Sequence, residues 1–117
     1  MGPPTPAQSR LLAELVRVAE GYAAVLRQQF TDCKTRPKEY CEECFELSVA
    51  AQTPPLPPEA ENPLVFDAST SDPSQTALLV MLWHEGRRVD DLEISYLEEH
   101  PPIASLSINS LLHEDAD

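Results

Sequence analysis

The sequence predicts an α+β fold in which an N-terminal helical hairpin is followed by a small antiparallel β-meander. Apolar residues recur at spacings of three and four from Leu11 to Phe30, which is the period of one helix face. A proline-rich stretch, residues 53–63, then divides the 117-residue chain into two parts. Beyond this stretch apolar and polar residues alternate, as they do in strands with one buried face.

The first arm of the predicted hairpin begins at Ala7, after a proline-rich lead at residues 1–6 that we expect to be disordered. Thr5 or Ser9 can cap its start. The apolar stripe of this helix is broad and has a second apolar flank beside it, so the helix requires more than one neighbour. The stripe comprises Leu11, Leu15, Val18, Tyr22, Val25, Leu26 and Phe30, and the flank comprises Leu12, Val16 and Ala19.

The second arm is predicted to begin near Pro37 and to end at Gln52 or Thr53, which completes a hairpin over residues 7–52. Proline is favoured in the first turn of a helix, and the glutamates that follow it suit the positive end of the helix dipole. The short connector between the two arms favours antiparallel packing. The apolar stripe of this second arm would comprise Tyr40, Cys44, Leu47 and Ala51.

Residues 53–63, TPPLPPEAENP, are predicted to form a linker with polyproline-II character. A short strand is expected at Leu64–Phe66, directly after this linker. The β-meander would span residues 64–112, and an acidic tail at residues 113–117 would follow it.

Residues 76–86 allow two interpretations. One is a helix that ends near His84, and the other is the first strand of a β-hairpin that turns around Glu85-Gly86-Arg87. We favour the hairpin, because a short apolar run suits a buried strand and the residues after the turn alternate with a strand period. The alternating positions are Leu92, Ile94 and Tyr96 in one predicted strand and Leu106 and Ile108 in the next.

The formal net charge is −12, and almost all of it lies beyond residue 52. Residues 1–52 carry six Lys/Arg and seven Asp/Glu, whereas residues 53–117 carry two and thirteen. Phosphate backbones and anionic lipid would repel the acidic half, so the charge argues against direct nucleic-acid binding and against membrane binding. A protein partner with a basic surface is favoured instead.

The longest apolar run, Ala77 to Trp83, is too short to span a bilayer. The first residues do not have the long apolar segment of a signal peptide. We therefore expect an intracellular protein, cytoplasmic or nuclear, whose cysteines are reduced.

All three cysteines lie in one short stretch. Cys41 and Cys44 form a Cys-x-x-Cys pair, and Cys33 is a third thiol. A structural zinc site needs four ligands, and the fourth would have to be one of three histidines that are distant in sequence. We favour core packing, because cysteine is among the most buried residue types. A small zinc or thiol protein is kept as an alternative, and no metal or cofactor is predicted.

Pro54, Pro55, Leu56, Pro57 and Pro58 form the sequence PPLPP, which contains the PxxP pattern in two registers. Such segments are polyproline-II ligands of SH3, WW and EVH1 domains. A stiff spacer between the two halves explains the same composition. Binding to a polyproline-reading domain is therefore an alternative function.

Catalysis finds little support in the sequence. Three glycines cannot supply a phosphate-binding loop, and neither a Gly-x-Ser-x-Gly nor a His-Glu-x-x-His motif occurs. We expect a protein that is not an enzyme, an adaptor or small subunit of an intracellular complex that can form a hetero-oligomer. The apolar face of its first helix would bind the partner. The predicted contact residues on that face are Leu11, Leu15, Val18, Tyr22 and Leu26.

Residues 92–108, LEISYLEEHPPIASLSI, resemble the strand–proline–strand portion of RWD domains, which are relatives of the ubiquitin-conjugating fold. Leu97 stands where that family has its first proline, and His100 stands in place of a tyrosine. The resemblance implies a non-catalytic protein-binding module. No site residue carries over, because RWD domains lack the catalytic cysteine. The matching positions are Leu92, Ile94, Tyr96, Pro101, Leu106 and Ile108.

Overall fold

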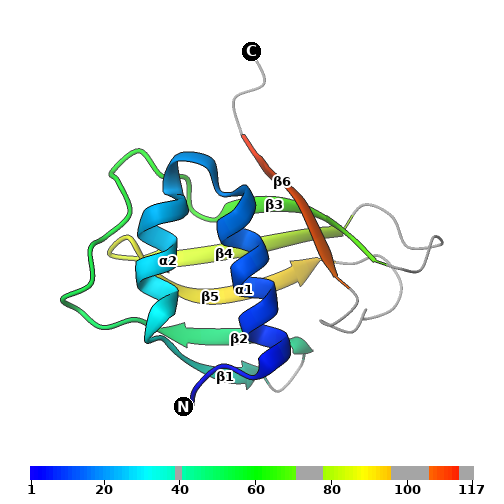
Figure 1. Ribbon diagram of the computed structural model, residues 1–117, viewed down its shortest axis with the longest axis horizontal. Coiled ribbons are helices and arrows are strands. Elements are labelled where there is room, and N and C mark those ends of the chain that lie inside the picture. Colours follow the sequence, from blue (N-terminus) through cyan, green and yellow to red (C-terminus); the bar gives the residue numbers. More distant parts are fainter. Residues whose placement is uncertain (39–40, 71–77, 96–105, 114–117) are drawn as a thin grey trace.

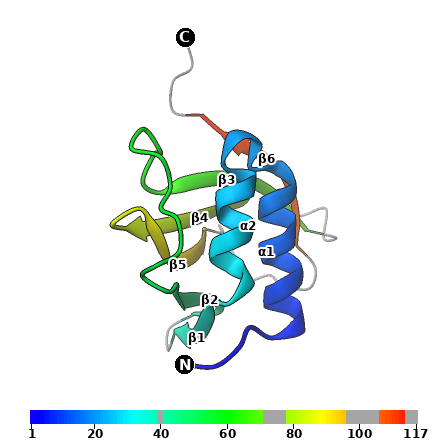
Figure 2. The same cartoon turned by 60° about the vertical axis from the view of Figure 1, so that its left-hand side comes forward.

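The computed structural model describes residues 1–38, 41–70, 78–95 and 106–113. In these residues two α-helices lie on one face of a six-stranded antiparallel sheet (Figures 1 and 2), which confirms the predicted α+β class. The strand order in the sheet is β1-β2-β5-β4-β3-β6. The elements are α1 (Pro6–Val18), the 3-10 turn η1 (Glu20–Tyr22), α2 (Ala23–Thr31), β1 (Lys34–Lys38), β2 (Cys41–Ser48), β3 (Leu64–Ser69), β4 (Leu78–Glu85), β5 (Arg88–Ser95) and β6 (Ser107–Leu112).

Helix α1 begins with a reciprocal cap. The backbone N–H of Gln8 donates to the Thr5 hydroxyl over 3.1 Å, and the backbone N–H of Thr5 donates to the Gln8 side chain over 2.9 Å. This capping box satisfies two of the donors that a helix start leaves unpaired. The Gln8 oxygen also accepts from the Thr35 hydroxyl over 2.8 Å, so the cap joins α1 to β1.

The helix predicted from Ala7 to Phe30 is not continuous. The chain leaves the helix after Val18 and turns through η1, where Glu20 has a φ of 55°. A left-handed residue cannot continue a right-handed helix, so α2 runs back beside α1 (Figure 2). The broad apolar stripe is thereby shared between two short helices that pack on each other.

The prediction of a second helix from Pro37 to Gln52 is wrong. Residues 34–38 and 41–48 form the antiparallel pair β1 and β2. Phe45 and Leu47 are buried while Glu46 is only partly buried, which is the alternation of a strand. Pro37 lies in an edge strand, where its missing N–H breaks no ladder hydrogen bond with β2.

The hairpin favoured for residues 76–86 and beyond is confirmed for its described part, residues 78–95. Strands β4 and β5 pair in antiparallel register with Leu82 opposite Leu92, and Gly86 and Arg87 form the turn with φ values of 59° and 64°. Two successive positive φ values give a turn whose twist matches that of the strands. The predicted strand around residues 64–66 is also confirmed, as β3, and the one around Leu106 and Ile108 is confirmed as β6.

The core fills the space between the helices and the covered face of the sheet. Every second residue of β3 and of β4 is buried, so one face of each strand meets the helices and the other does not. Fully buried members from both layers include Leu11, Leu15, Leu26, Phe45, Phe66, Val80, Leu82 and Leu92.

Candidate partner-binding groove

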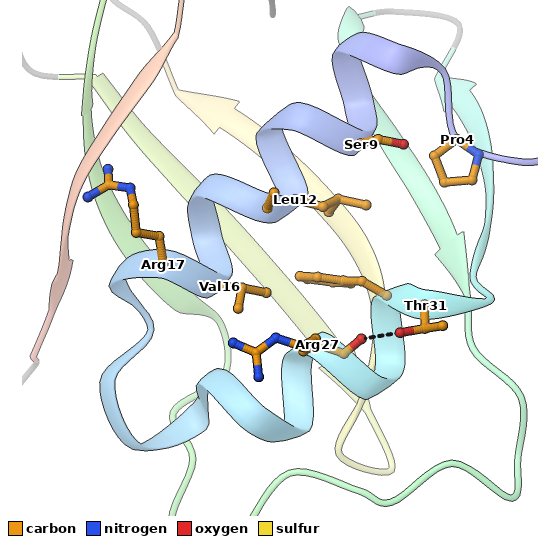
Figure 3. Close-up of a pocket in the computed structure, with 9 residues that line it drawn as sticks. Pro4, Ser9, Leu12, Val16, Arg17, Arg27 and Thr31 are labelled. Atoms are coloured by element: carbon orange, nitrogen blue, oxygen red, sulfur yellow. Dashed lines mark hydrogen bonds between the residues drawn. The ribbon is translucent and has the colours of Figure 1, made fainter.

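A groove of about 430 Å³ opens between α1 and α2 on the side of the helices that faces away from the sheet (Figure 3). We call it the helix groove. Its apolar surface comes from both helices, and polar side chains stand at its ends. The lining residues are Pro4, Ser9, Leu12, Ala13, Val16, Arg17, Arg27, Phe30 and Thr31.

The helix groove exists because α1 is apolar on two adjoining faces. Leu11 and Leu15 belong to the face that packs on the sheet, and both are fully buried. Leu12 and Val16 belong to the neighbouring face and form the floor of the groove (Figure 3). Phe30 of α2 completes this floor and is partly buried. An apolar surface of this kind that remains partly open is a common feature of protein-binding sites.

Arg27 lies over α2, the Arg17 side chain points toward β6, and Pro4 and Ser9 lie near the start of α1 (Figure 3). Arg17 forms an ion pair with Glu14 at 2.9 Å. The hydrogen bond from Arg17 is the main reason why the pKa of Glu14 is lowered, so this pair is ionised at neutral pH. Arg27 is exposed.

The charge of the helical layer differs from that of the whole chain. Residues 6–31 carry three arginines and two glutamates, a net charge of +1 in a chain of net charge −12. Solvent-exposed charges more than about 10 Å apart are largely screened at physiological salt. A ligand in the helix groove therefore experiences the local arginines more strongly than the distant acidic residues.

The structure places the predicted contact residues elsewhere. Leu11, Leu15 and Leu26 are fully buried in the core, and Val18 and Tyr22 are partly buried against it. None of the five lines the helix groove. Leu11, Leu15 and Leu26 are core residues and not a partner surface, whereas the partner role expected for Val18 and Tyr22 stays a prediction. The residues that were missed belong to the second apolar flank of α1, whose Leu12 and Val16 were already visible in the sequence as a separate stripe.

The PPLPP segment is fastened to the rest of the molecule instead of hanging free as a spacer. Leu56 is fully buried, and its backbone N–H donates to the carbonyl of Arg87 over 2.7 Å. The carbonyl of Pro54 accepts from the side chain of Gln29 over 3.0 Å. Pro54, Pro55 and Pro58 are exposed and Pro57 is partly buried, so the segment presents prolines outward while its leucine anchors it.

The other end of the predicted linker is fastened as well. Asn62 donates to the carbonyl of His84 over 2.7 Å and accepts from its backbone N–H over 3.1 Å. Arg88 donates to the carbonyl of Thr53 over 2.9 Å at the start of the linker. The proline-rich stretch is therefore bound along its length to the end of the β4–β5 hairpin.

The cysteines do not form a metal site in the described residues. Cys33 is a free thiol, and burial raises its pKa. Cys44 is also buried and is disulfide-bonded, so the expectation of reduced cysteines is wrong for this residue. The side chain of Cys41 lies outside the described residues. Within the described part of the chain, no three potential ligands come together to hold a metal ion.

The β1 edge of the sheet is covered by the chain itself. Gly2 and Thr35 exchange two backbone hydrogen bonds of 3.1 and 2.7 Å, so the lead that we expected to be disordered pairs with β1. Pro37, two residues further on, has no N–H to offer. This edge therefore has few free groups with which to add a further strand.

Two arginines of α1 bind the chain at the start of β6. Arg10 donates to the carbonyl of Leu106 over 3.1 Å, and Arg17 donates to the carbonyl of Ile108 over 2.7 Å. These carbonyls would otherwise be available to a partner strand. Strand addition is thus obstructed at part of each edge, which favours side-chain surfaces as the route to a partner.

Comparisons with known proteins do not assign the chain to a family. No family model matches it, and neither the curated proteins nor the solved structures searched include a match. The resemblance to RWD domains stays a prediction, because residues 96–105 lie outside the described residues. In the part of the chain that the structure describes, neither helix has the length and apolar character needed to cross a bilayer.

Proposed function

We propose that this protein is a non-enzymatic adaptor or small subunit of a protein complex, and that it binds its partner through the helix groove. One observation carries the proposal. The helix groove is lined by Val16 and Phe30, which stay partly exposed after the core has formed, and by Leu12, which is 3% exposed at its floor. Its walls are two helices that pack on each other and on the sheet, so the surface is present before any partner arrives.

The partly obstructed edges of the sheet support the same conclusion. A partner that added a strand would have to displace Gly2 from β1 or the arginines from β6. A partner that fills the helix groove displaces no hydrogen bond between the helices and the sheet. The protein can therefore bind without rearranging its fold.

The test uses two exposed alanines on the helices. Ala13 lines the helix groove, whereas Ala24 on α2 does not. Ala13→Glu puts a charged side chain on the apolar floor, four residues before Arg17, where the two can pair. Ala24→Glu adds the same charge and has the same cost in helix propensity. Partners are captured from native lysate with tagged wild-type protein and with each variant, after circular dichroism has shown equal folding.

We expect specific partners to be retained by wild type and Ala24→Glu and lost by Ala13→Glu. Equal capture by both variants would remove the helix groove from consideration. The basic partner surface expected from the charge of residues 53–117 stays a prediction. Such a partner would not use the helix groove, whose end is cationic.

A second candidate function is that of a ligand for a polyproline-reading domain. Pro55 and Pro58 form one PxxP register, and both are exposed. Because Leu56 is anchored in the core, a reader would have to bind the segment from its outer side. Pro55→Ala with Pro58→Ala should abolish capture of such a reader and leave the unfolding midpoint unchanged. Retained capture would exclude this candidate.

The intracellular location, cytoplasmic or nuclear, stays a prediction from the sequence. The disulfide at Cys44 counts against it, because disulfides are rare in the cytosol. The alternative of a small zinc or thiol protein also stays a prediction, and the burial of Cys33 counts against a reactive thiol at that position.

A further inference from the structure

We propose that the helix groove binds a short amphipathic helix whose apolar residues are followed by carboxylates, an inference that rests on the proposed function. Three features of the groove lead to this ligand. They are the nature of its walls, its length and the position of its charges.

The walls of the helix groove are helices, which exclude a ligand held by main-chain hydrogen bonds. Within a helix the backbone N–H and C=O groups bond to one another, so α1 and α2 offer side chains only. Extended ligands gain much of their affinity from main-chain bonds to a strand edge. A helical ligand satisfies its own backbone and binds by its side chains, which suits this surface.

The length of the apolar floor fits a ligand of two to three helical turns. The α1 wall runs from Ser9 to Val16, which corresponds to about 10.5 Å at 1.5 Å per residue. The α1 lining residues Ser9, Leu12, Ala13 and Val16 have the spacing of one helix face. A ligand with apolar residues at positions i, i+3 or i+4, and i+7 can place each of them on this floor.

The charges at the groove require an acidic ligand. Arg27 is exposed, and no ion pair to it is found among the described residues. Arg17 already donates to Glu14 and to the carbonyl of Ile108, so this step of the argument rests on Arg27. A carboxylate of the ligand would form charge-assisted hydrogen bonds with the guanidinium group of Arg27.

Other occupants fit the helix groove less well. A basic segment would be repelled by Arg27, which lines the groove (Figure 3). A second copy of the chain is an alternative occupant, which the sedimentation measurement below tests. The acidic amphipathic helix is the occupant that suits both the apolar floor and Arg27.

The experiment is a selection from a phage-displayed library of random 16-residue peptides against the full-length chain. Peptides that also bind Ala13→Glu are removed by counter-selection, so that only ligands of the helix groove remain. The best peptide is then measured by fluorescence anisotropy with wild type, Arg27→Glu and Lys34→Glu. Lys34 is exposed on β1 and does not line the groove, so its reversal changes the net charge equally and serves as the control.

We expect the selected peptides to be enriched in Leu, Ile or Phe at helical spacing together with Asp or Glu. Arg27→Glu should weaken binding at least about tenfold, Lys34→Glu should change it less than about twofold, and added salt should weaken it for wild type. Peptides that are neutral or basic, or that bind Arg27→Glu as well as wild type, would overturn the inference while leaving the helix groove as a binding site.

Two further outcomes are decisive. If no peptide depends on Ala13 and lysate partners bind Ala13→Glu normally, both the inference and the proposed function are wrong. If wild type forms a dimer in sedimentation that Arg27→Glu abolishes, the groove is occupied by a second copy of this chain, and the acidic-peptide inference is overturned.

Discussion

Gln29 is a buried polar side chain whose loss we expect to destabilise the fold strongly. It is 1% exposed, and its amide donates to the carbonyls of Pro54 (3.0 Å) and Arg87 (3.2 Å). Its oxygen accepts from the backbone N–H of Val89 over 2.9 Å. One side chain of α2 thus holds both the proline-rich stretch and the end of the β4–β5 hairpin.

The substitution Gln29→Leu keeps the volume of the side chain and removes all three hydrogen bonds. The Arg87 carbonyl still accepts from the N–H of Leu56, and water can reach the carbonyl of the exposed Pro54. The buried Val89 N–H is left without a partner, which costs about 1–3 kcal/mol. With about 1 kcal/mol for the lost bond to Pro54, the total is about 2–4 kcal/mol.

The assay is urea unfolding followed by the fluorescence of Trp83, the single tryptophan. With a slope of about 2 kcal/mol per molar urea, the midpoint should fall by about 1–2 M. Gln28→Leu is the matched control, because Gln28 is exposed and surface changes usually stay within about 0.5 kcal/mol. A Gln29→Leu midpoint equal to that of the control would refute the reasoning.

The substitution Gln29→Glu tests the contribution of the hydrogen bonds to stability while the side-chain volume stays nearly the same. Its carboxylate keeps an acceptor for Val89 but cannot donate to either carbonyl, and it buries a charge. Its pKa in the folded state must therefore be raised, so the stability of this variant should increase as the pH falls towards that pKa. A loss of stability that does not change with pH would show that the shape of the side chain, and not its hydrogen bonding, explains the destabilisation.

Three other predictions concern residues outside the helix groove. Leu56→Ala should lower the free energy of unfolding by about 2–5 kcal/mol in the same urea assay, because this leucine is fully buried; an unchanged midpoint would contradict its place in the core. Burial, followed by the charges of Asp91 and Glu85, raises the pKa of Asp90, so the folded state binds its proton more tightly than the unfolded chain does. Stability is therefore lost as the pH rises through the folded pKa. Asp90→Asn should raise the melting temperature at pH 7, and this gain should vanish below pH 3.8, the ordinary pKa of the group. A variant that melts at a lower temperature than wild type at pH 7 would disprove this. Cys33 should react with iodoacetamide slowly in the native protein and rapidly in urea, because it is 3% exposed and its pKa is raised; rapid native labelling would instead favour a reactive thiol.

The β4–β5 hairpin was predictable because its signals are local. Gly86 tolerates a positive φ, and the alternation of Leu92 and Ile94 with polar residues marks a strand whatever its neighbours are. The start of α1 was predictable for the same reason, since Thr5 and Gln8 form their cap within four residues.

Strands β1 and β2 were not predictable in this way. The apolar side chains between positions 41 and 48 fit a helical stripe as well as a strand. Proline is found both in the first turn of a helix and in edge strands, so Pro37 does not decide between them. The choice depends on β5, whose Leu92 lies opposite Phe45 in the sheet. A window of local sequence does not contain that partner.

The helix groove was predictable only in part. Both apolar flanks of α1 were visible, but the sequence did not say which of them would face the sheet. That choice follows from the break at Glu20, which folds α2 back, and from the contacts of Arg10 and Arg17 with β6. These contacts join residues 96 and 91 positions apart, beyond the reach of any periodicity argument.

The hydrogen bonds from Arg10 and Arg17 of α1 to Leu106 and Ile108 have a consequence for folding during protein synthesis. A ribosome releases the N-terminal part first, at about 5–20 residues per second, so α1 emerges several seconds before the residues that hold it. Until Leu106 and Ile108 leave the exit tunnel, the arginines of α1 have no carbonyls to bind, and the last strand of the sheet is missing. The fold is therefore completed only after Leu106 and Ile108 have left the exit tunnel. A chain truncated before β6 should remain a client of chaperones.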